Sequence, residues 1–395
     1  MTATDPIVIV GAARTPMGGF LGDLKDAPAH ALGARAISAA VERAGIKAES
    51  VDEILMGCVL PAGQGQAPAR QAAIGAGLPL AAGATTINKM CGSGMKSAMV
   101  AHDLLRAGSA DVVVAGGMES MSNAPYLLDR ARSGYRMGHG RTLDHMFLDG
   151  LEDAYDKGCL MGTFAEDCAE AYQFTRKEQD AYALSSLERA NRAISSGDFA
   201  WEIAPVSVKA GKSETLVATD EQPPKAKPDK IPTLKPAFRD GGTVTAANSS
   251  SISDGAAALI MMRESEAEKR GVTPLARVVA HSTHAAAPKD FPTAPISALK
   301  KLFDKTGWSK DSVDLFEINE AFAIVAMAAM RDLGLAHEKV NVNGGACALG
   351  HPIGASGARI LVTLIAALRA RGGRRGLASL CIGGGEATAM AIEAV

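Results

Sequence analysis

The sequence predicts an α/β fold built from two similar halves, with a segment of different character inserted between them. Two stretches of the 395-residue chain, near 85–117 and 340–385, repeat one plan of strand, polar turn, small-residue helix, strand and glycine turn. Their apolar runs, Val112 to Ala115 and Leu377 to Ile382, are continuous, which is typical of strands with helices on both faces. These features indicate a duplicated α/β unit.

The insertion is the region richest in charged and irregular segments. It contains a predicted helix at about 177–195, ended by Gly197, and a tail at 223–236 whose five prolines and four lysines predict an extended surface loop. The other predicted elements are strands at 7–10, 85–88, 111–117, 313–316, 340–343 and 377–382, and helices that end near Arg106 and Arg371. We assign residues 1–120 and 251–272 to the N-terminal half, 121–250 to an inserted loop domain and 273–395 to the C-terminal half.

The composition argues against several classes of partner. Hydrophobic residues make up 47% of the chain and charged residues 21%, as in ordinary folded soluble proteins. The 41 basic and 43 acidic residues nearly cancel, so no overall positive field would collect nucleic acid or an anionic membrane. The longest purely apolar stretch, Phe322 to Met330, is too short to span a bilayer. Since neither end carries a targeting segment, we expect a cytoplasmic protein with no nucleic-acid or membrane partner.

Cys91 is one of six cysteines, none of which forms a C-x-x-C pair, so we expect free thiols. It lies between an apolar strand and a helix whose first turn is nearly free of bulk. Free N–H groups at a helix start favour a thiolate and lower the thiol pKa from about 8.5. Gly92 and Gly94 let a substrate approach the backbone. A structural cysteine at a tight turn is the alternative, and this segment alone does not separate the two.

His351 lies in a turn too rich in glycine and proline to be helical. Because Pro352 follows it, its backbone is held in an extended or turn conformation, which suits a side chain that must be aimed. Histidine is the usual base for activating a thiol. Cys347 stands four residues earlier, but without helical geometry the two are not a metal pair, and we predict no metal ligands.

Two further segments are weaker when taken alone. Cys381 ends the last core strand beside Gly383 and two more glycines, whose N–H groups could form an oxyanion hole for a thioester. A simple tight turn explains that segment better by itself. Asn319 follows an apolar strand and opens a small-residue helix, so it either caps the helix or holds an ordered water.

Together, these four segments resemble the signature motifs of the thiolase family. The motifs are C-G-S-G at Cys91, N-E-A-F at Asn319, G-G-x-x-x-x-G-H-P around His351 and C-x-G-G-G at Cys381, in the family's order and spacing. Supporting matches lie at 10–16, 116–122, 242–250 and 254–257. The resemblance implies a five-layer α-β-α-β-α core of two five-stranded halves, an inserted loop domain, and an active site between the halves.

The resemblance also implies roles for individual residues. Cys91, deprotonated with help from His351, would accept an acyl group from an acyl-coenzyme A (CoA). Cys381 would remove the α-proton of a second acetyl-CoA, whose carbanion attacks acyl-Cys91. The N–H groups of Cys91 and Gly383 would bind one thioester oxygen, and His351 with a water held by Asn319 would bind the enolate. We expect acetyl-CoA, CoA and acetoacetyl-CoA as substrates and products, with no cofactor and no metal.

Substrate-binding positions follow by the same resemblance. The pantetheine channel would be lined by Ser250, Phe238, Ala321 and Phe322, and Met161 would contact the acyl group. Phe291 with Pro292 resembles members that tolerate 2-methyl-branched substrates. The sequence departs from the family at Leu160, at Glu386-Ala387, and in lacking a phosphate-binding arginine, for which Lys225, Lys227 or Lys230 could substitute unless they form a solvated lysine run.

The expected activity is that of an acetyl-CoA C-acetyltransferase, assembled as a homotetramer, a dimer of dimers. A broader or longer-chain 3-ketoacyl-CoA thiolase is the alternative. A 3-ketoacyl synthase shares the duplicated fold but typically has a histidine or asparagine where Cys381 stands. An inactive acyl-CoA-binding relative would have no need of Cys91, His351 and Cys381 together.

Overall fold

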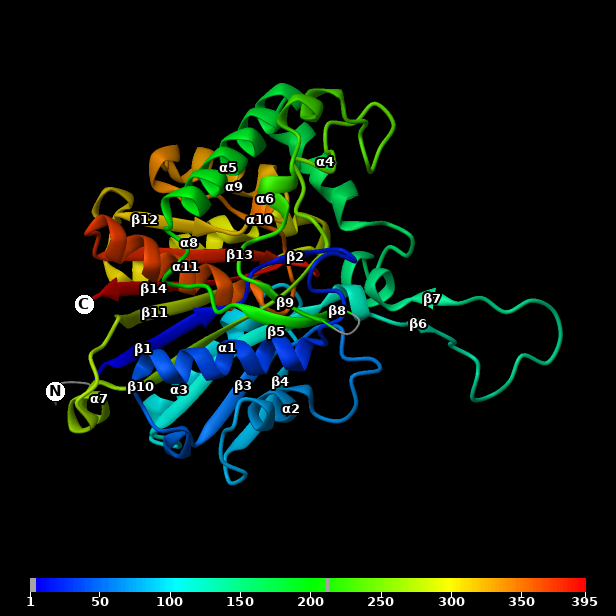
Figure 1. Ribbon diagram of the computed structural model, residues 1–395. Coiled ribbons are helices and arrows are strands. Elements are labelled where there is room, and N and C mark those ends of the chain that lie inside the picture. The colour runs from blue at the N-terminus through cyan, green and yellow to red at the C-terminus, as the bar shows by residue number, and fades with distance from the viewer. Residues whose placement is uncertain (1–4, 211–212) are drawn as a thin grey trace.

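The computed structural model describes residues 5–210 and 213–395. Ten of the described strands form a mixed sheet in two parts that enclose a pair of central helices (Figure 1), and two separate hairpins, β6–β7 and β8–β9, lie outside it. From edge to edge the order is β12, β13, β14, β11, β1, β10, β5, β3 and β4, with β2 paired to β10. Their bounds are β1 Ile7–Arg14, β2 Gly18–Gly19, β3 Glu53–Gly57, β4 Gly83–Ile87, β5 Val112–Ser120, β10 Ser253–Arg263, β11 Ala276–Ala285, β12 Leu315–Ile318, β13 Arg375–Ile382 and β14 Glu386–Ala394.

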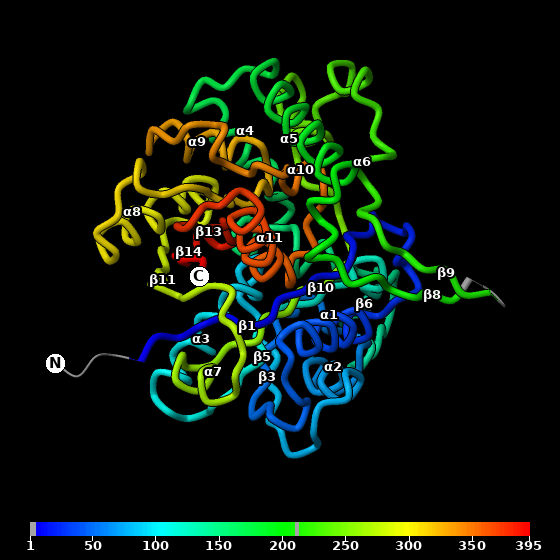
Figure 2. Tube along the Cα trace, turned by 60° about the vertical axis from the view of Figure 1, so that its left-hand side comes forward, coloured from blue at the N-terminus to red at the C-terminus, as the bar shows by residue number. Residues whose placement is uncertain are grey.

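Helices form the outer layers and the middle layer. The outer face of the first half is covered by α1 and α2, and that of the second half by α8 and α9, while α3 and α11 contact each other between the two parts of the sheet. Figure 2 shows α11 in the middle of the molecule, with α1 and α2 on one side and α8 and α9 on the other. The bounds are α1 Ala29–Ala44, α2 Pro68–Gly75, α3 Ser93–Ala107, α7 Glu264–Arg270, α8 Ala294–Thr306, α9 Ala323–Leu333, α10 Ala346–Leu349 and α11 Ser356–Arg371.

Strands β1, β5, β10 and β13 are buried on both faces, as their continuous apolar sequences predict. In β1, Val8 and Val10 belong to the core under α1 and α2, whereas Ile7 and Ile9 belong to the central core around α3 and α11. In β13, Leu377 packs in the core under α8 and α9. Two of these cores lie between the outer helices and the sheet, and the central core surrounds α3 and α11 between the two parts of the sheet. The order of layers is α-β-α-β-α, so the predicted class is confirmed.

The strand count of the second half differs from the expectation. The described residues of the first half contribute five strands to the sheet path, but those of the second contribute four, and the two parts are joined by three residue pairs between β1 and β11. The predicted strand at 340–343 is wrong. Asn341 takes a left-handed φ of 49°, and its side chain binds both the N–H and the carbonyl oxygen of Ile318 at 2.8 Å. Only Val340 keeps a single bridge, to Phe316.

The helices of the insertion pack over the second half, whereas its β8–β9 hairpin packs against the core of the first half (Figure 1). The helix predicted at 177–195 is α5, Arg176–Ser196, which begins at a Thr175 capping box and ends at Gly197 with a φ of 80°. The predicted loop at 223–236 instead contains two short helical turns, α6 Gln222–Lys225 and η4 Pro228–Thr233. The other elements here are α4 Met161–Ala171, β6 Tyr126–Leu127, β7 Leu143–Asp144, β8 Val206–Ala210 and β9 Ser213–Val217.

Two general expectations can be compared with the structure. All six cysteines are free thiols, as expected. Among residues 5–210 and 213–395, no helix has the length and apolar character needed to cross a membrane.

Candidate active site

An apolar cavity of about 360 Å³ lies where the two halves and the insertion meet. Ten of the eleven predicted site residues line it: Cys91, Met161, Phe238, Ser250, Phe291, Ala321, Phe322, His351, Cys381 and Gly383. Asn319 is the exception. Segments separated by nearly 300 residues along the chain therefore bring the predicted side chains to one place.

Cys91 is held at the end of β4 by an unusual backbone. Met90 immediately before it has a φ of 47°, a left-handed conformation that costs a non-glycine residue free energy and recurs at functional sites. Gly92 then packs so tightly that an added Cβ would lie 2.3 Å from Ile382. The strained turn leaves the thiol partly buried at the start of α3, facing the cavity.

The pKa of Cys91 runs against the sequence prediction. Burial raises it to about 11, and the negative charge of Glu119 adds to the rise. The backbone N–H groups of Gly383 and of Cys91 itself act in the opposite direction, but they do not offset the loss of hydration. The prediction of a lowered pKa was therefore wrong, because it counted the helix start and not the surrounding protein.

Cys381 and Gly383 belong to a glycine turn that packs directly against the Cys91 turn, where Ile382 contacts Gly92. Cys381 is 1% exposed at the end of β13, and burial, with Cys91 nearby, raises the pKa of its thiol far above the usual range. Gly383 has open space around its Cα, the nearest atom to an added Cβ being the sulfur of Met161 at 3.6 Å. Its N–H points at the Cys91 sulfur, as an oxyanion-hole donor would.

His351 is positioned by contacts on its Nδ1 side. Nδ1 lies 2.6 Å from the hydroxyl of Ser356, which donates to the carbonyl oxygen of Pro352 at 2.9 Å. Because the Ser356 hydroxyl donates its only proton to Pro352, it can only accept a hydrogen bond from His351 Nδ1–H. The proton of the neutral ring is therefore on Nδ1, and Nε2 has a free lone pair. Nε2 is buried without a protein partner, and burial with the charge of Arg359 lowers the pKa of His351 to about 3. The ring is thus a neutral acceptor beside the cavity.

Asn319 lies behind His351 and not on the cavity wall. Its side-chain nitrogen is 3.5 Å from His351 Nδ1, and its oxygen is 3.5 Å from Arg359 Nη2. The helix-cap alternative is wrong, because α9 begins at Ala323 with Phe322 as its N-cap residue.

Comparison with known proteins identifies the family over nearly the whole chain. Residues 7–265 match the N-terminal domain of thiolase, and residues 272–394 match its C-terminal domain. The chain belongs to the thiolase family.

The thiolase relatives are similar over nearly their full length. Acetyl-CoA acetyltransferase 2 of Arabidopsis thaliana is 51% identical over 98% of this chain and 96% of its own. The acetyl-CoA acetyltransferase of Cupriavidus necator is 49% identical over 98% of this chain and 99% of its own. The crystal structure of the Bacillus anthracis acetyl-CoA acetyltransferase superposes with a TM-score of 0.97 at 42% identity and covers both chains completely.

Aromatic rings narrow the thiolase cavity beside the thiols. Phe322 packs edge-on against Phe238 with centroids 5.9 Å apart, and lies 6.2 Å from Phe291, which is itself buried. Met161, the first residue of α4, and Leu160 extend this apolar wall. The wall is therefore mainly apolar, with Ser249, Ser250 and Ser251 as polar residues of the same cavity.

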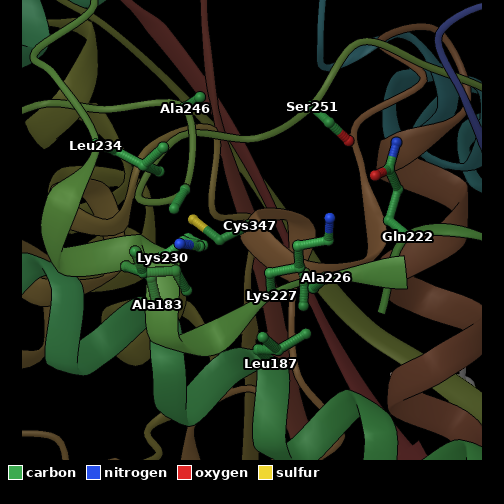
Figure 3. Close-up of a pocket in the computed structure, with 13 residues that line it drawn as sticks. Ala183, Leu187, Gln222, Ala226, Lys227, Lys230, Leu234, Ala246, Ser251 and Cys347 are labelled. Carbon is green, nitrogen blue, oxygen red and sulfur yellow. The ribbon is translucent and has the colours of Figure 1, made fainter. Parts of the chain in front are cut away.

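A second cavity of about 340 Å³ adjoins the first and shares Ala246 and Ser251 with it. Its lining includes Lys227, Lys230 and Cys347 (Figure 3). Lys225 does not line it and instead binds Glu221 at 2.7 Å and Asp23 at 3.1 Å. Cys347 faces this second cavity while His351 faces the first.

Glu119 is a buried residue whose function the sequence patterns did not reveal. Its carboxylate accepts from the N–H groups of Val59, Leu60 and Gly354 at 2.9, 3.1 and 2.9 Å. It therefore ties β5 to the His351 turn, and burial raises its pKa to about 7. A carboxylate inside the apolar strand 112–120 is the one signal that could have marked it.

Arg359 was also missed. It is 1% exposed on α11, contacts Glu317 at 3.5 Å and supports Asn319 from behind. Burial raises the pKa of Glu317 to about 8, against the opposing charge of Arg359. The Arg359–Glu317 pair therefore lies beyond Asn319, on the side of Asn319 that faces away from His351.

Proposed function

We propose that this thiolase is an acetyl-CoA C-acetyltransferase, which converts two acetyl-CoA to acetoacetyl-CoA and CoA and catalyses the reverse cleavage. The observation that carries the proposal is the grouping of two thiols, Cys91 and Cys381, with the free Nε2 of His351 on one cavity. One thiol can be acylated while the other moves a proton. Relatives named acetyl-CoA acetyltransferase, with about half their residues identical, support the acetyl group as substrate.

In the first step, the Cys91 sulfur attacks the acetyl-CoA carbonyl as its proton passes to His351 Nε2. A neutral imidazole with a low pKa accepts that proton only when negative charge forms beside it, so transfer and attack coincide. The N–H groups of Cys91 and Gly383 bind the oxyanion. The bond between the acetyl carbon and the CoA sulfur then breaks, and Cys381 gives its proton to the leaving thiolate.

In the second step, the Cys381 thiolate removes a proton from the methyl group of a second acetyl-CoA. Because the pKa of this thiol is far above the usual range, its thiolate is a strong base. The carbanion attacks the acetyl carbon, a carbon–carbon bond forms, and the bond to Cys91 breaks. The departing Cys91 sulfur recovers its proton from His351, so Cys91, Cys381 and His351 return to their starting forms.

The two cavities suit the two ends of CoA. The aromatic wall with Ser250 and Ala321 would hold the pantetheine arm, while Lys227 and Lys230 would bind phosphates in the adjoining cavity. Replacing Lys227 and Lys230 together by Met should raise the KM for CoA about tenfold or more and leave kcat nearly unchanged. Lys225→Met is the matched control, since Lys225 is already paired. An unchanged KM in the double variant would remove these lysines from the CoA site.

The test of the activity is a substrate series. Acetoacetyl-CoA, 2-methylacetoacetyl-CoA and longer 3-ketoacyl-CoA are each cleaved with CoA, and kcat/KM is compared. We expect acetoacetyl-CoA to give the highest value. A higher value for a long acyl chain would indicate the broader thiolase instead, and activity only on malonyl thioesters would indicate a synthase.

We also propose a cytoplasmic homotetramer. Strand β4 at the end of the sheet and the segment between β6 and β7, which extends away from the body, are surfaces that subunit contacts could use (Figure 1). Analytical ultracentrifugation should give the mass of four chains. A monomer at micromolar concentration would contradict this assembly.

A further inference from the structure

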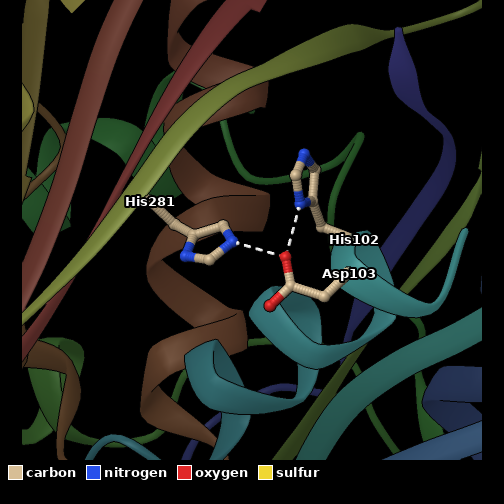
Figure 4. A group of neighbouring side chains, drawn as sticks. All are labelled: His102, Asp103 and His281. Atoms are coloured by element: carbon tan, nitrogen blue, oxygen red, sulfur yellow. Dashed lines mark hydrogen bonds and ion pairs between the residues drawn. The ribbon is translucent and has the colours of Figure 1, made fainter. Parts of the chain in front are cut away.

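Away from both cavities, three side chains that commonly bind metals meet on the surface (Figure 4). His102 and Asp103 lie on α3, and His281 lies on β11. Asp103 Oδ1 is 3.0 Å from His102 Nδ1 and 3.0 Å from His281 Nε2. The ligand atoms of all three residues lie within 4.8 Å of one another. One carboxylate oxygen therefore lies within hydrogen-bonding distance of a nitrogen of each imidazole.

The spacing is close to that of a metal site. Zinc bonds of about 2.0–2.2 Å at tetrahedral angles place neighbouring ligand atoms about 3.4 Å apart. Both nitrogens must now donate N–H to the same oxygen, which holds the rings at 84° to each other with centroids 5.0 Å apart. A metal ion between the three residues would replace the protons on His102 Nδ1 and His281 Nε2 and bind the lone pairs of these two nitrogens.

The site is also supported on one side and open on the other. The side chains of His102 and His281 are 17% and 19% exposed, whereas that of Asp103 is 59% exposed. The imidazoles are thus fixed by a helix and a strand, and the carboxylate side leaves room for water as a fourth ligand. Such positioning by rigid elements favours a defined geometry.

We propose that His102, Asp103 and His281 bind a divalent transition metal ion, for which Zn²⁺ is the best match. Imidazole nitrogen suits zinc and its neighbours, whereas Ca²⁺ and Mg²⁺ take oxygen ligands. The ion would link α3 of the first half to β11 of the second. Its role is structural, because none of the three residues lines the catalytic cavity and His102 lies about 14 Å along α3 from the first residue of that helix, Ser93, near Cys91.

One charge opposes the ion. The Lys305 ammonium binds the backbone carbonyl oxygen of His281 at 2.8 Å, which places a positive charge near the site. The Asp103 carboxylate offsets it. Lys305→Met should therefore tighten metal binding, whereas Asp103→Asn, which removes the opposing charge, should abolish it.

The test is a titration of the full, chelator-treated protein with Zn²⁺ by calorimetry, followed by Co²⁺ as a visible-light probe. Cys91 is first alkylated so that the active-site nucleophile does not bind the metal. We expect one ion per chain with a Kd near micromolar or tighter, a Co²⁺ spectrum without thiolate bands, and a Tm raised by the ion. His281→Ala and the exposed Asp103→Asn should each lose this ion, while His284→Ala on the same strand keeps it.

Folding is separated from binding by measuring Tm in chelator, where the wild type and Asp103→Asn should agree. Equal stoichiometry in the wild type, His281→Ala and Asp103→Asn would overturn the proposal, as would a Co²⁺ spectrum dominated by thiolate bands. Binding only at millimolar Zn²⁺ would overturn it as well.

Discussion

The two turns that carry the thiols of the candidate active site come from the two halves of one duplicated fold, yet their sulfur atoms differ in exposure and in hydrogen bonding. Cys91 stands after β4 in a strained turn, partly exposed, with two N–H groups aimed at it. Cys381 is the penultimate residue of β13, pairs with Ala387 of β14 and is 1% exposed. The proposed mechanism assigns different roles to them: the accessible thiol forms the acyl bond, and the buried thiol, whose basicity lost hydration increases, acts as the base.

The largest effect should come from removing the accessible thiol. Cys91→Ala should lower the condensation rate by about 10⁴-fold or more, because no covalent intermediate can form. Steady-state assays of acetoacetyl-CoA formation and cleavage measure this. Cys168→Ala, at another buried cysteine, should remain active. Substantial activity in Cys91→Ala would contradict the covalent route.

Removing the buried thiol should separate the two half-reactions. Cys381→Ala should lower condensation about 10²- to 10⁴-fold, since a general base is lost. Transfer of the acetyl group to Cys91, followed by rapid quench, should fall much less. A small fall in acetyl transfer is still expected, because Cys381 also protonates the leaving CoA thiolate. An equal fall in both steps would contradict a main role for Cys381 in removing the proton from the second acetyl-CoA.

The pH dependence of the free enzyme sharpens the comparison further. Because burial raises the pKa of Cys91 to about 11, the thiol is protonated at neutral pH and its thiolate fraction rises with pH. Alkylation of Cys91 by iodoacetamide should therefore quicken about tenfold per pH unit between about pH 7 and pH 9. A plateau that begins at or below pH 7 would show instead that a thiolate–imidazolium pair exists before substrate binds.

The smallest effect concerns the contact between the two turns. Lys89, two residues before Cys91, forms an ion pair with Glu386, the residue after the glycine turn. The pair is partly exposed, so breaking it with Lys89→Met should lower kcat only about two- to fivefold, with less effect at high salt. The double variant with Glu386→Gln should be no worse than either single one. Additive losses would mean that the residues act independently.

Much of the fold and of the candidate site could be predicted from the sequence, because these features depend on local patterns or on the order of motifs. The burial of β5 and β13 and the end of α5 at Gly197 follow from local patterns. The cavity residues follow from the resemblance to the thiolase motifs. The pKa of Cys91 could not, because the groups that desolvate it lie far along the chain. Asn341 was misjudged since its side chain replaces the backbone pairing of a strand.

Partnerships across the fold were also beyond sequence patterns. Glu119 and Gly354 are 235 residues apart, and Asp103 and His281 are 178 apart, so only the packed structure brings them together. Ser356 follows His351 by five residues, but the bond that selects the histidine tautomer depends on the turn between them.

The most direct test of the division between the two thiols is mass spectrometry of Cys381→Ala after incubation with acetyl-CoA. Retention of Cys91 with loss of the base predicts that one acetyl group accumulates on the peptide containing Cys91, while little acetoacetyl-CoA is made. An unmodified Cys91 peptide, an acetyl group on another residue, or acetoacetyl-CoA formed at the wild-type rate would contradict it.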